Sequence, residues 1–207
     1  MHQYKAIILI GPTGSGKTPL GKLIERQGLW GRRCAHFDFG ENLRQIAVTN
    51  NRPSFLTEQD MTVINDSLKT GALLENETFH IASGILKFSI QEKEINTGDI
   101  LILDGLPRHV GQARNVDAIL DIGMIVCLEC SAKTVQRRIA LNSGGDRADR
   151  IDDSLEEIKG KLEIFHERTV PLLDHYRAKG VKVEQITITV DITPEEIHQS
   201  LEGDHLF

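Results

Sequence analysis

The chain has 207 residues and a formal net charge of −6, from 24 Lys and Arg against 30 Asp and Glu. This length suits one well-buried domain with small insertions and argues against two independent domains. The acidic balance argues against a broad nucleic-acid-binding surface, and no apolar stretch approaches the roughly twenty residues that cross a bilayer, so we expect neither nucleic acid nor membrane as a partner.

A glycine-rich loop at residues 11–18 directly follows the apolar segment Ala6–Ile10. Glycines allow the sharp turn that aims successive backbone N–H groups inward, the Lys17 ammonium suits the β and γ phosphates, and the Thr18 hydroxyl suits Mg²⁺. Apolar residues recur at helical spacing after the loop, so strand, loop and helix come in the required order. The residues predicted to bind ATP are Gly11, Pro12, Thr13, Gly14, Ser15, Gly16, Lys17 and Thr18.

Short apolar segments of strand length recur along the chain and alternate with segments of helical periodicity. These predicted strands are Ala6–Ile10, Ala35–Phe39, Ile100–Leu103, Ile125–Leu128 and Val181–Ile188. Such alternation is typical of a parallel sheet that helices cover on both faces. We therefore predict a three-layer α/β sandwich with five parallel strands.

The segment between the second and third predicted strands, residues 40–99, is too long for one crossover helix. Helical periodicity covers Gln59–Lys69 and Glu77–Ile90, which indicates an inserted helical lobe. Further helices are predicted at Ser154–Phe165 and after Thr193, where a cap residue precedes a proline and two acidic residues.

The three cysteines, Cys34, Cys127 and Cys130, are too few for a disulfide framework, which favours a reducing, cytoplasmic compartment. Cys127 and Cys130 have C-x-x-C spacing, so a redox or metal role is an alternative. Both lie in an apolar, strand-like segment, and we expect two buried thiols. The histidines lack metal-ligand spacing, and the first residues contain too few apolar side chains for a signal peptide.

Charged side chains occur where the predicted strands end. Arg44 follows the second strand, Arg108 follows the third, and Arg138 lies on the helix after the fourth. Arginines in such places can surround the charge that spreads over a transferred phosphoryl group. Asp104 ends the third strand, where a carboxylate can hold Mg²⁺ through its water shell. Alternatively, Asp104 caps a turn with Gly105.

Four sequence elements occur in a family-typical order along nearly the whole chain. They are the glycine loop, Gly40–Arg44, Leu103–Arg108 with Gln112, and Arg150–Asp153 followed by Leu162 and Pro171. The third of them, Asp-Gly-Leu-Pro-Arg four residues before a glutamine, is the most specific. Together they resemble the adenylate kinases and their nucleoside monophosphate kinase relatives.

The resemblance implies a single P-loop NTPase domain over residues 1–207, with a nucleoside-monophosphate-binding insertion at 39–75 and a short lid at 141–152. The lid lacks cysteine, so we expect no zinc. Gln112 would read the adenine edge of AMP, and Asp152 and Asp153 would orient lid arginines. The implied acceptor-binding residues are Phe39, Gly40, Arg44, Leu74, Gly105, Arg108 and Gln112. The implied catalytic residues are Lys17, Arg108, Arg138, Arg147 and Arg150, with Mg²⁺ held at Thr18 and Asp104, partly through water.

The chain departs from the usual pattern of this family at several positions. Thr18 and Pro19 stand where Gly and Thr are usual, and Phe39 stands where a threonine usually lies beside the acceptor base. Asn142 and Lys161 occupy positions where arginine is frequent, and a lysine keeps the charge but loses the bidentate fork. Phe39 can stack on a base or narrow the pocket, which bears on the choice of acceptor.

We predict a monomeric, magnesium-dependent kinase that transfers the γ-phosphoryl group of ATP in line to a nucleoside monophosphate, with AMP favoured. No side-chain base is assigned, because an acceptor phosphate is already an anionic nucleophile. One alternative is a kinase for UMP, CMP or a deoxynucleotide. Others are a small-molecule P-loop kinase with Asp38 or Glu41 as base, and a nucleotide-binding protein with weak turnover.

Overall fold

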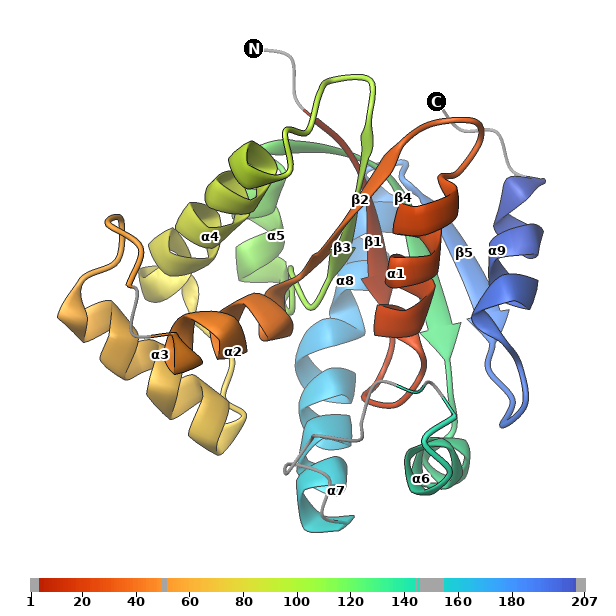
Figure 1. Ribbon diagram of the computed structural model, residues 1–207. Helices are drawn as coiled ribbons and strands as arrows, with labels where there is room; N and C mark the ends of the chain where they lie inside the picture. The colour runs from red at the N-terminus through yellow and green to blue at the C-terminus, as the bar shows by residue number, and fades with distance from the viewer. Residues whose placement is uncertain (1–3, 50–51, 144, 146–154, 204–207) are drawn as a thin grey trace.

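The computed structural model describes residues 4–49, 52–143, 145 and 155–203. Five parallel strands form one sheet in the order β2-β3-β1-β4-β5, with β1 at its centre (Figure 1). The strands are β1 Tyr4–Ile10, β2 Cys34–Asp38, β3 Ile100–Asp104, β4 Leu120–Glu129 and β5 Lys182–Thr187. The predicted five-stranded parallel α/β fold is confirmed.

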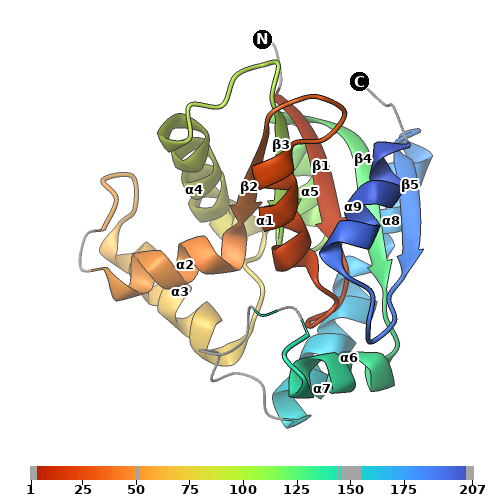
Figure 2. The ribbon, with the colours of Figure 1, turned by 45° about the vertical axis from the view of Figure 1, so that its right-hand side comes forward.

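Helices cover both faces of this sheet. α1 and α9 pack on one face, and α4, α5 and α8 pack on the other (Figures 1 and 2). The described helices are α1 Lys17–Gln27, α2 Phe39–Val48, α3 Glu58–Thr70, α4 Phe79–Glu92, α5 Val110–Val116, α6 Ala132–Ala140, α7 Leu155–Ile164, α8 Pro171–Ala178 and α9 Pro194–Glu202. A 3₁₀ turn at Asn76–Thr78 precedes α4, and a π-helical turn at Phe165–Thr169 precedes α8.

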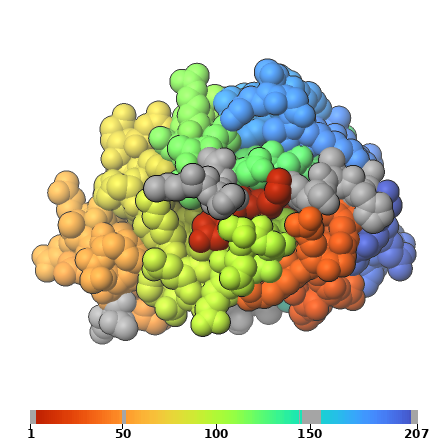
Figure 3. Space-filling model, turned by 90° about the horizontal axis from the view of Figure 1, so that it is seen from above, coloured from red at the N-terminus to blue at the C-terminus, as the bar shows by residue number. Residues whose placement is uncertain are grey.

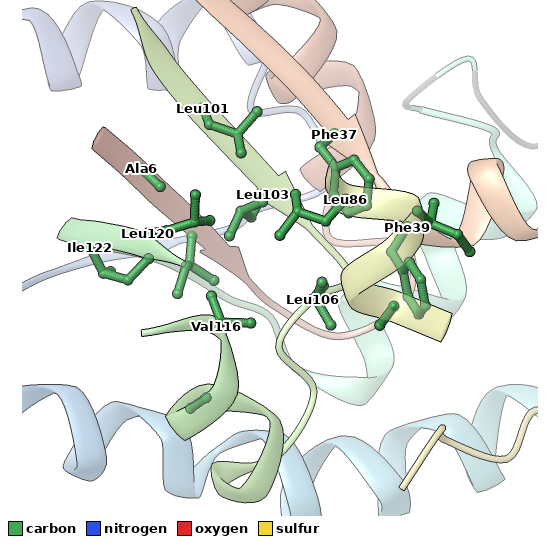
Figure 4. Packing of buried hydrophobic residues seen from close by; sticks show 14 of the residues in the cluster. Ala6, Phe37, Phe39, Leu86, Leu101, Leu103, Leu106, Val116, Leu120 and Ile122 are labelled. Atoms are coloured by element: carbon green, nitrogen blue, oxygen red, sulfur yellow. The ribbon is translucent and has the colours of Figure 1, made fainter. Parts of the chain in front are cut away.

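The strands are buried on both faces, which explains their continuous apolar sequences. Ile7 belongs to the apolar cluster under α1 and α9, whereas the adjacent Ala6 belongs to the cluster on the other face. Figure 4 shows part of the second cluster, in which Leu101 and Leu103 of β3 lie with Phe37 of β2. Because all five strands are parallel, their carboxyl ends share one edge of the sheet, and the loops there converge.

The segment between β2 and β3 forms the inserted helical lobe that the sequence predicts. Its helices α2 and α3 extend to one side of the sheet (Figure 1), and this lobe is the light orange part at the left of Figure 3, which views the molecule from the amino ends of the strands. The Asp38 side chain accepts the backbone N–H of Glu41 and so caps α2. Thr57 and Asp60 form a capping box that starts α3. Local hydrogen bonds therefore define where both helices begin.

Several predicted boundaries shift by a few residues. β2 ends at Asp38 rather than Phe39, because the Asp38 carboxylate caps a helix in which Phe39 is the first residue. The helix predicted at Glu77–Ile90 begins as a 3₁₀ turn and continues as α4. The expectation of two buried thiols in one strand is half right: Cys127 is 3% exposed, but Cys130 follows the end of β4 and is partly exposed.

Most of the predicted lid at residues 141–152 lies outside the described residues, as do Arg147, Arg150, Asp152 and Asp153. Within the described ranges, no helix has both the length and the apolar character needed to span a membrane.

Candidate active site

The glycine-rich loop turns sharply between β1 and α1. Gly14 and Gly16 have φ angles of 75° and 101°, a region that other residues rarely adopt. At Gly11 a side chain is excluded by contact instead, since a Cβ atom there would lie 2.6 Å from Ser15 Oγ. The Ser15 hydroxyl is buried and has no hydrogen-bond partner among the described residues. Backbone N–H groups at the start of α1 face the same space, so the loop can cradle an anion.

The Lys17 ammonium lies across the mouth of this loop. Its Nζ donates hydrogen bonds to the carbonyl oxygens of Gly11 at 2.9 Å and Pro12 at 3.0 Å. These two hydrogen bonds hold the ammonium group of the flexible Lys17 side chain next to the space that the loop encloses. The positive charge of Lys17 therefore lies at the edge of the loop, where it can meet an anion that the loop binds.

The Arg138 side chain extends from α6 to the same loop, and its guanidinium group donates hydrogen bonds to backbone carbonyls. Its Nε donates to Gly14 O at 3.2 Å, and its Nη1 donates to Thr189 O at 2.8 Å. Nη1 also lies within hydrogen-bond distance of Val190 O and Ile192 O. With only 4% of the residue exposed, Arg138 braces the loop against the segment between β5 and α9. This bracing role was not foreseen from the sequence.

Two carboxylates meet the Thr18 hydroxyl at the carboxyl end of the sheet. Asp104 Oδ2 lies 2.7 Å and Asp38 Oδ2 lies 3.0 Å from Thr18 Oγ1. Burial raises the pKa of the Asp104 carboxyl above its usual value; the Lys17 charge opposes this rise and the Asp38 charge adds to it. A hydroxyl between two carboxylates supplies oxygen ligands, which Mg²⁺ prefers, and Mg²⁺ usually keeps several of its waters as well.

Two arginines, Arg44 and Arg108, line the site together with the glycine-rich loop. The part of the site around them is the acceptor side, named after the acceptor-binding residues predicted there. Arg108, after β3, is half-buried, and its guanidinium makes no hydrogen bond or ion pair with another described residue. Burial lowers the pKa of Arg108, and the Asp104 charge opposes that shift. Arg44, on α2, is exposed and likewise has no such partner among the described residues. Both guanidinium groups are thus available for an anionic ligand.

Gln112 is buried beneath this acceptor side and binds two backbone groups. Its Oε1 accepts Arg108 N–H at 2.7 Å, and its Nε2 donates to Leu74 O at 2.7 Å. His109 also contacts Leu74 O, at 3.1 Å from its Nε2. Each amide atom of Gln112 keeps one further hydrogen-bonding position, one as donor and one as acceptor. Such a pair can bind a ligand edge that presents an acceptor beside a donor.

Phe39 lies between the hydrophobic core and the acceptor side. It is 6% exposed, and its ring stacks on Phe37 with centroids 6.2 Å apart (Figure 4). Because Phe39 is the first residue of α2 instead of the last residue of β2, it also borders the acceptor side of the cavity.

One cavity of about 220 Å³ joins the loop to the acceptor side. It brings together most of the residues predicted from the sequence. Those lining it are Gly11, Pro12, Thr13, Gly14, Gly16, Lys17, Thr18, Phe39, Gly40, Arg44, Leu74, Asp104, Gly105, Arg108, Gln112 and Arg138. Ser15, which was also predicted, lies in the loop wall and is buried.

The π-helical turn before α8 holds the acceptor side in place, a role that sequence patterns did not indicate. Arg168 donates two hydrogen bonds to the Glu75 carboxylate, at 2.9 and 2.8 Å. Thr169 Oγ1 donates to Arg108 O at 2.9 Å. A π turn often marks a functional site, and this one connects the two segments that carry Leu74 and Arg108.

A P-loop at the carboxyl edge of a parallel sheet, sharing one cavity with unpaired arginines, defines a P-loop nucleotide-binding protein. The family model of adenylate kinase matches residues 9–181. The chain belongs to the adenylate kinase family.

Individual relatives agree with this assignment. The chain is 30% identical over 203 residues to adenylate kinase isoenzyme 5 of Mus musculus, which covers 97% of this chain and 32% of that relative. It is 30% identical over 186 residues to the adenylate kinase of Parvibaculum lavamentivorans, covering 84% of this chain and 80% of that relative. A third relative, the adenylate kinase of Desulfitobacterium hafniense, is 26% identical over 231 residues, covering 96% and 98%. The chain spans about a third of the length of the isoenzyme 5 relatives.

Proposed function

We propose that the protein transfers the γ-phosphoryl group of ATP to a nucleoside monophosphate, with AMP as the favoured acceptor. The observation that carries this proposal is the single cavity in which the P-loop faces Arg44, Arg108 and Gln112. A donor site and an acceptor site that share one cavity allow direct transfer between two bound nucleotides.

On the donor side, the backbone N–H groups of the loop and the Lys17 ammonium bind the ATP phosphates. Thr18 and Asp104 would hold Mg²⁺, with Asp104 acting through water. Bound there, the ion would neutralise charge on the β and γ phosphate oxygens. Arg138 keeps Gly14 in position and thereby preserves the loop geometry.

On the acceptor side, Arg108 and Arg44 bind the phosphate of the monophosphate and aim its oxygen at the γ phosphorus. The acceptor oxygen is already anionic, so the reaction requires no side-chain base. Gln112 selects adenine through its remaining donor and acceptor positions. Arg147 and Arg150, outside the described residues, are proposed to complete the charge around the transferring group.

A coupled assay with ATP, Mg²⁺ and a panel of AMP, UMP, CMP, GMP and dAMP tests the proposal. AMP is expected to give the highest kcat/KM. Preference for UMP or CMP would overturn the assignment of AMP, and it would identify Phe39 as the residue to replace next, for example by Thr. Tight ATP binding without transfer to any monophosphate would overturn the kinase assignment itself.

The proposal also covers the setting in which the reaction takes place. Cys34 and Cys127 are buried and form no disulfide, and free thiols persist in a reducing compartment, which supports a cytoplasmic location. A monomer is expected, since the cavity contains donor and acceptor groups from one chain. Sedimentation equilibrium in the presence of both nucleotides tests this expectation.

A further inference from the structure

Asp38 and Asp104 form a matched pair at the carboxyl edge of the sheet. They are register partners on the adjacent strands β2 and β3, and each places one carboxylate oxygen within 3.0 Å of Thr18 Oγ1. The Thr18 hydroxyl has one hydrogen and can donate it to only one of them. One carboxylate oxygen is therefore left facing the hydroxyl without a donor.

A third polar atom lies near Asp104. His36 Nε2 is buried, has no hydrogen-bond partner among the described residues, and lies 4.0 Å from Asp104 Oδ2. His36 is two residues before Asp38 on β2, so both side chains face α1. The local excess of acceptors and this orphaned nitrogen together indicate that a hydrated cation completes the site.

The two carboxylates differ in how firmly they are held. Asp38 Oδ1 accepts Glu41 N–H at 2.8 Å, and Asp38 O accepts the Asn42 amide at 2.7 Å, so Asp38 is held at the start of α2. Among the described residues, the Asp104 side chain makes no hydrogen bond other than that with Thr18. Asp104 can therefore turn toward the waters of a metal ion, whereas Asp38 cannot turn without uncapping α2.

We propose that Asp38 is a positioning residue: its Oδ2 accepts the Thr18 hydroxyl hydrogen, which leaves the Thr18 oxygen free to bind Mg²⁺. Its Oδ1 at the same time caps α2, so the orientation of Thr18 is linked to the start of that helix. The proposal rests on the magnesium-nucleotide site assigned above. Asp38 thereby connects the donor loop to the helix that carries Arg44. Magnesium nucleotide binding is then expected to steady the first turn of α2.

Three substitutions separate this role from simple helix capping. In Asp38→Asn, the single amide oxygen is needed for the Glu41 N–H, so the amide nitrogen faces Thr18 and competes with the metal for its oxygen. Asp38→Ser keeps a capping oxygen but is too short to reach Thr18. Asp66→Asn removes an exposed charge from α3 of the same lobe and serves as the matched control.

The primary measurement is calorimetric binding of ADP with and without Mg²⁺, which requires no turnover. The ratio of the two dissociation constants is expected to fall about tenfold in Asp38→Asn and Asp38→Ser, as for other residues that orient a metal ligand. Metal-free ADP affinity and the ratio in Asp66→Asn are expected to stay unchanged. An unchanged ratio in both Asp38 variants would overturn the proposal.

A second arm tests whether the effect passes through Thr18. In a Thr18→Val background, Asp38→Asn is expected to cause no further loss of the magnesium ratio. A full additional tenfold loss in that background would contradict the proposal. Circular dichroism and the melting temperature verify that every variant folds.

A third arm follows α2 directly. Mg²⁺ with ADP is expected to slow amide exchange of residues 39–44 in the unmodified protein and to slow it less in Asp38→Asn. Equal protection in both would refute the link to α2. Because none of these measurements uses an acceptor, a failed acceptor panel would overturn the kinase proposal alone and leave the Asp38 result to stand on its own.

Discussion

Lys17 illustrates how a single charge depends on its surroundings: its ammonium is held by Gly11 and Pro12 carbonyls, at the edge of the space that the loop encloses. Lys17→Ala is expected to abolish phosphoryl transfer with the fold intact, because the side chain packs in no apolar core. Steady-state kinetics and circular dichroism measure both. Lys22→Ala, on the exposed side of α1, is the control and should retain activity. Substantial transfer by Lys17→Ala would mean that the loop does not hold the donor.

Arg108 is the residue on which the acceptor assignment depends most. If Arg108 binds the acceptor phosphate as proposed, Arg108→Ala removes a charge-assisted hydrogen-bond fork. The loss of about 3 kcal/mol of transition-state stabilisation is expected to lower acceptor kcat/KM by about two orders of magnitude, with donor KM nearly unchanged. Arg114→Ala, exposed on α5, is the matched control. If only ATP binding weakened in Arg108→Ala, the acceptor role would be wrong.

The cysteines give a prediction for pH dependence. Burial raises the pKa of Cys34 to about 12 and that of Cys127 to about 11. Both therefore remain protonated thiols until the pH approaches those values, and the thiolate is the reactive form. Burial also raises the pKa of Cys130, but its side chain is partly exposed. Iodoacetamide at pH 8, followed by peptide mass mapping, is therefore expected to label Cys130 first, with faster labelling at higher pH. Rapid labelling of Cys34 in the folded protein would contradict this order.

At the scale of elements, Gly21 permits the contact between α1 and β2. A Cβ atom at Gly21 would lie 2.3 Å from His36 Cδ2 and 2.4 Å from Nε2. Gly21→Ala is therefore expected to lower the free energy of unfolding by about 1–3 kcal/mol, although alanine favours helix. Urea denaturation provides the measurement.

Gly160 is the matched control on α7, because a Cβ atom there would meet nothing within 4 Å. Gly160→Ala is expected to raise the free energy of unfolding by about 0.5–1 kcal/mol through helix propensity. The two glycines should thus respond with opposite signs. Stabilisation by both substitutions would show that the His36 ring can move away from an added methyl group without loss of stability.

Element types were predictable, whereas element ends often were not. Periodicity and the break at Thr70-Gly71 predicted α3 to within one residue at each end, because both signals are local in sequence. The predicted end of β2 was one residue too late, because an apolar residue such as Phe39 is typical of a strand. In the structure the Asp38 carboxylate accepts the Glu41 N–H and starts α2 at Phe39. The π turn at Phe165–Thr169 had no sequence signal, although Pro171 lacks the N–H that would continue a regular helix.

At the scale of the whole molecule, α9, the last described helix, packs against α1, the first (Figure 2). Trp30 Nε1 donates to Leu201 O at 2.8 Å, and His198 Nε2 lies 2.8 Å from Gly28 O. Leu201 itself is 1% exposed within the cluster under α1. The last described helix is thus part of the core on the α1 face of the sheet.

Leu201→Ala is expected to lower the free energy of unfolding by about 2–4 kcal/mol, because it leaves a cavity in that core. Urea denaturation measures the change. Gln199→Ala, exposed on the same helix, should alter stability by less than about 0.5 kcal/mol. Equal small effects for both substitutions would mean that α9 contributes little to the core.

The sequence by itself determined the P-loop, the parallel sheet and the candidate arginines, because these depend on local spacing and on the order of strands and helices. It also pointed to Asp104 through its place at the end of the third predicted strand, and to Gln112 through a family resemblance. Only the tertiary structure decided how Thr18, Asp38 and Asp104 meet, because their approach depends on the register of β2 with β3 and on the packing of α1. The hydrogen bonds of Arg138 to Gly14 and Thr189 also depend on the tertiary structure, because they join segments that are far apart in the chain.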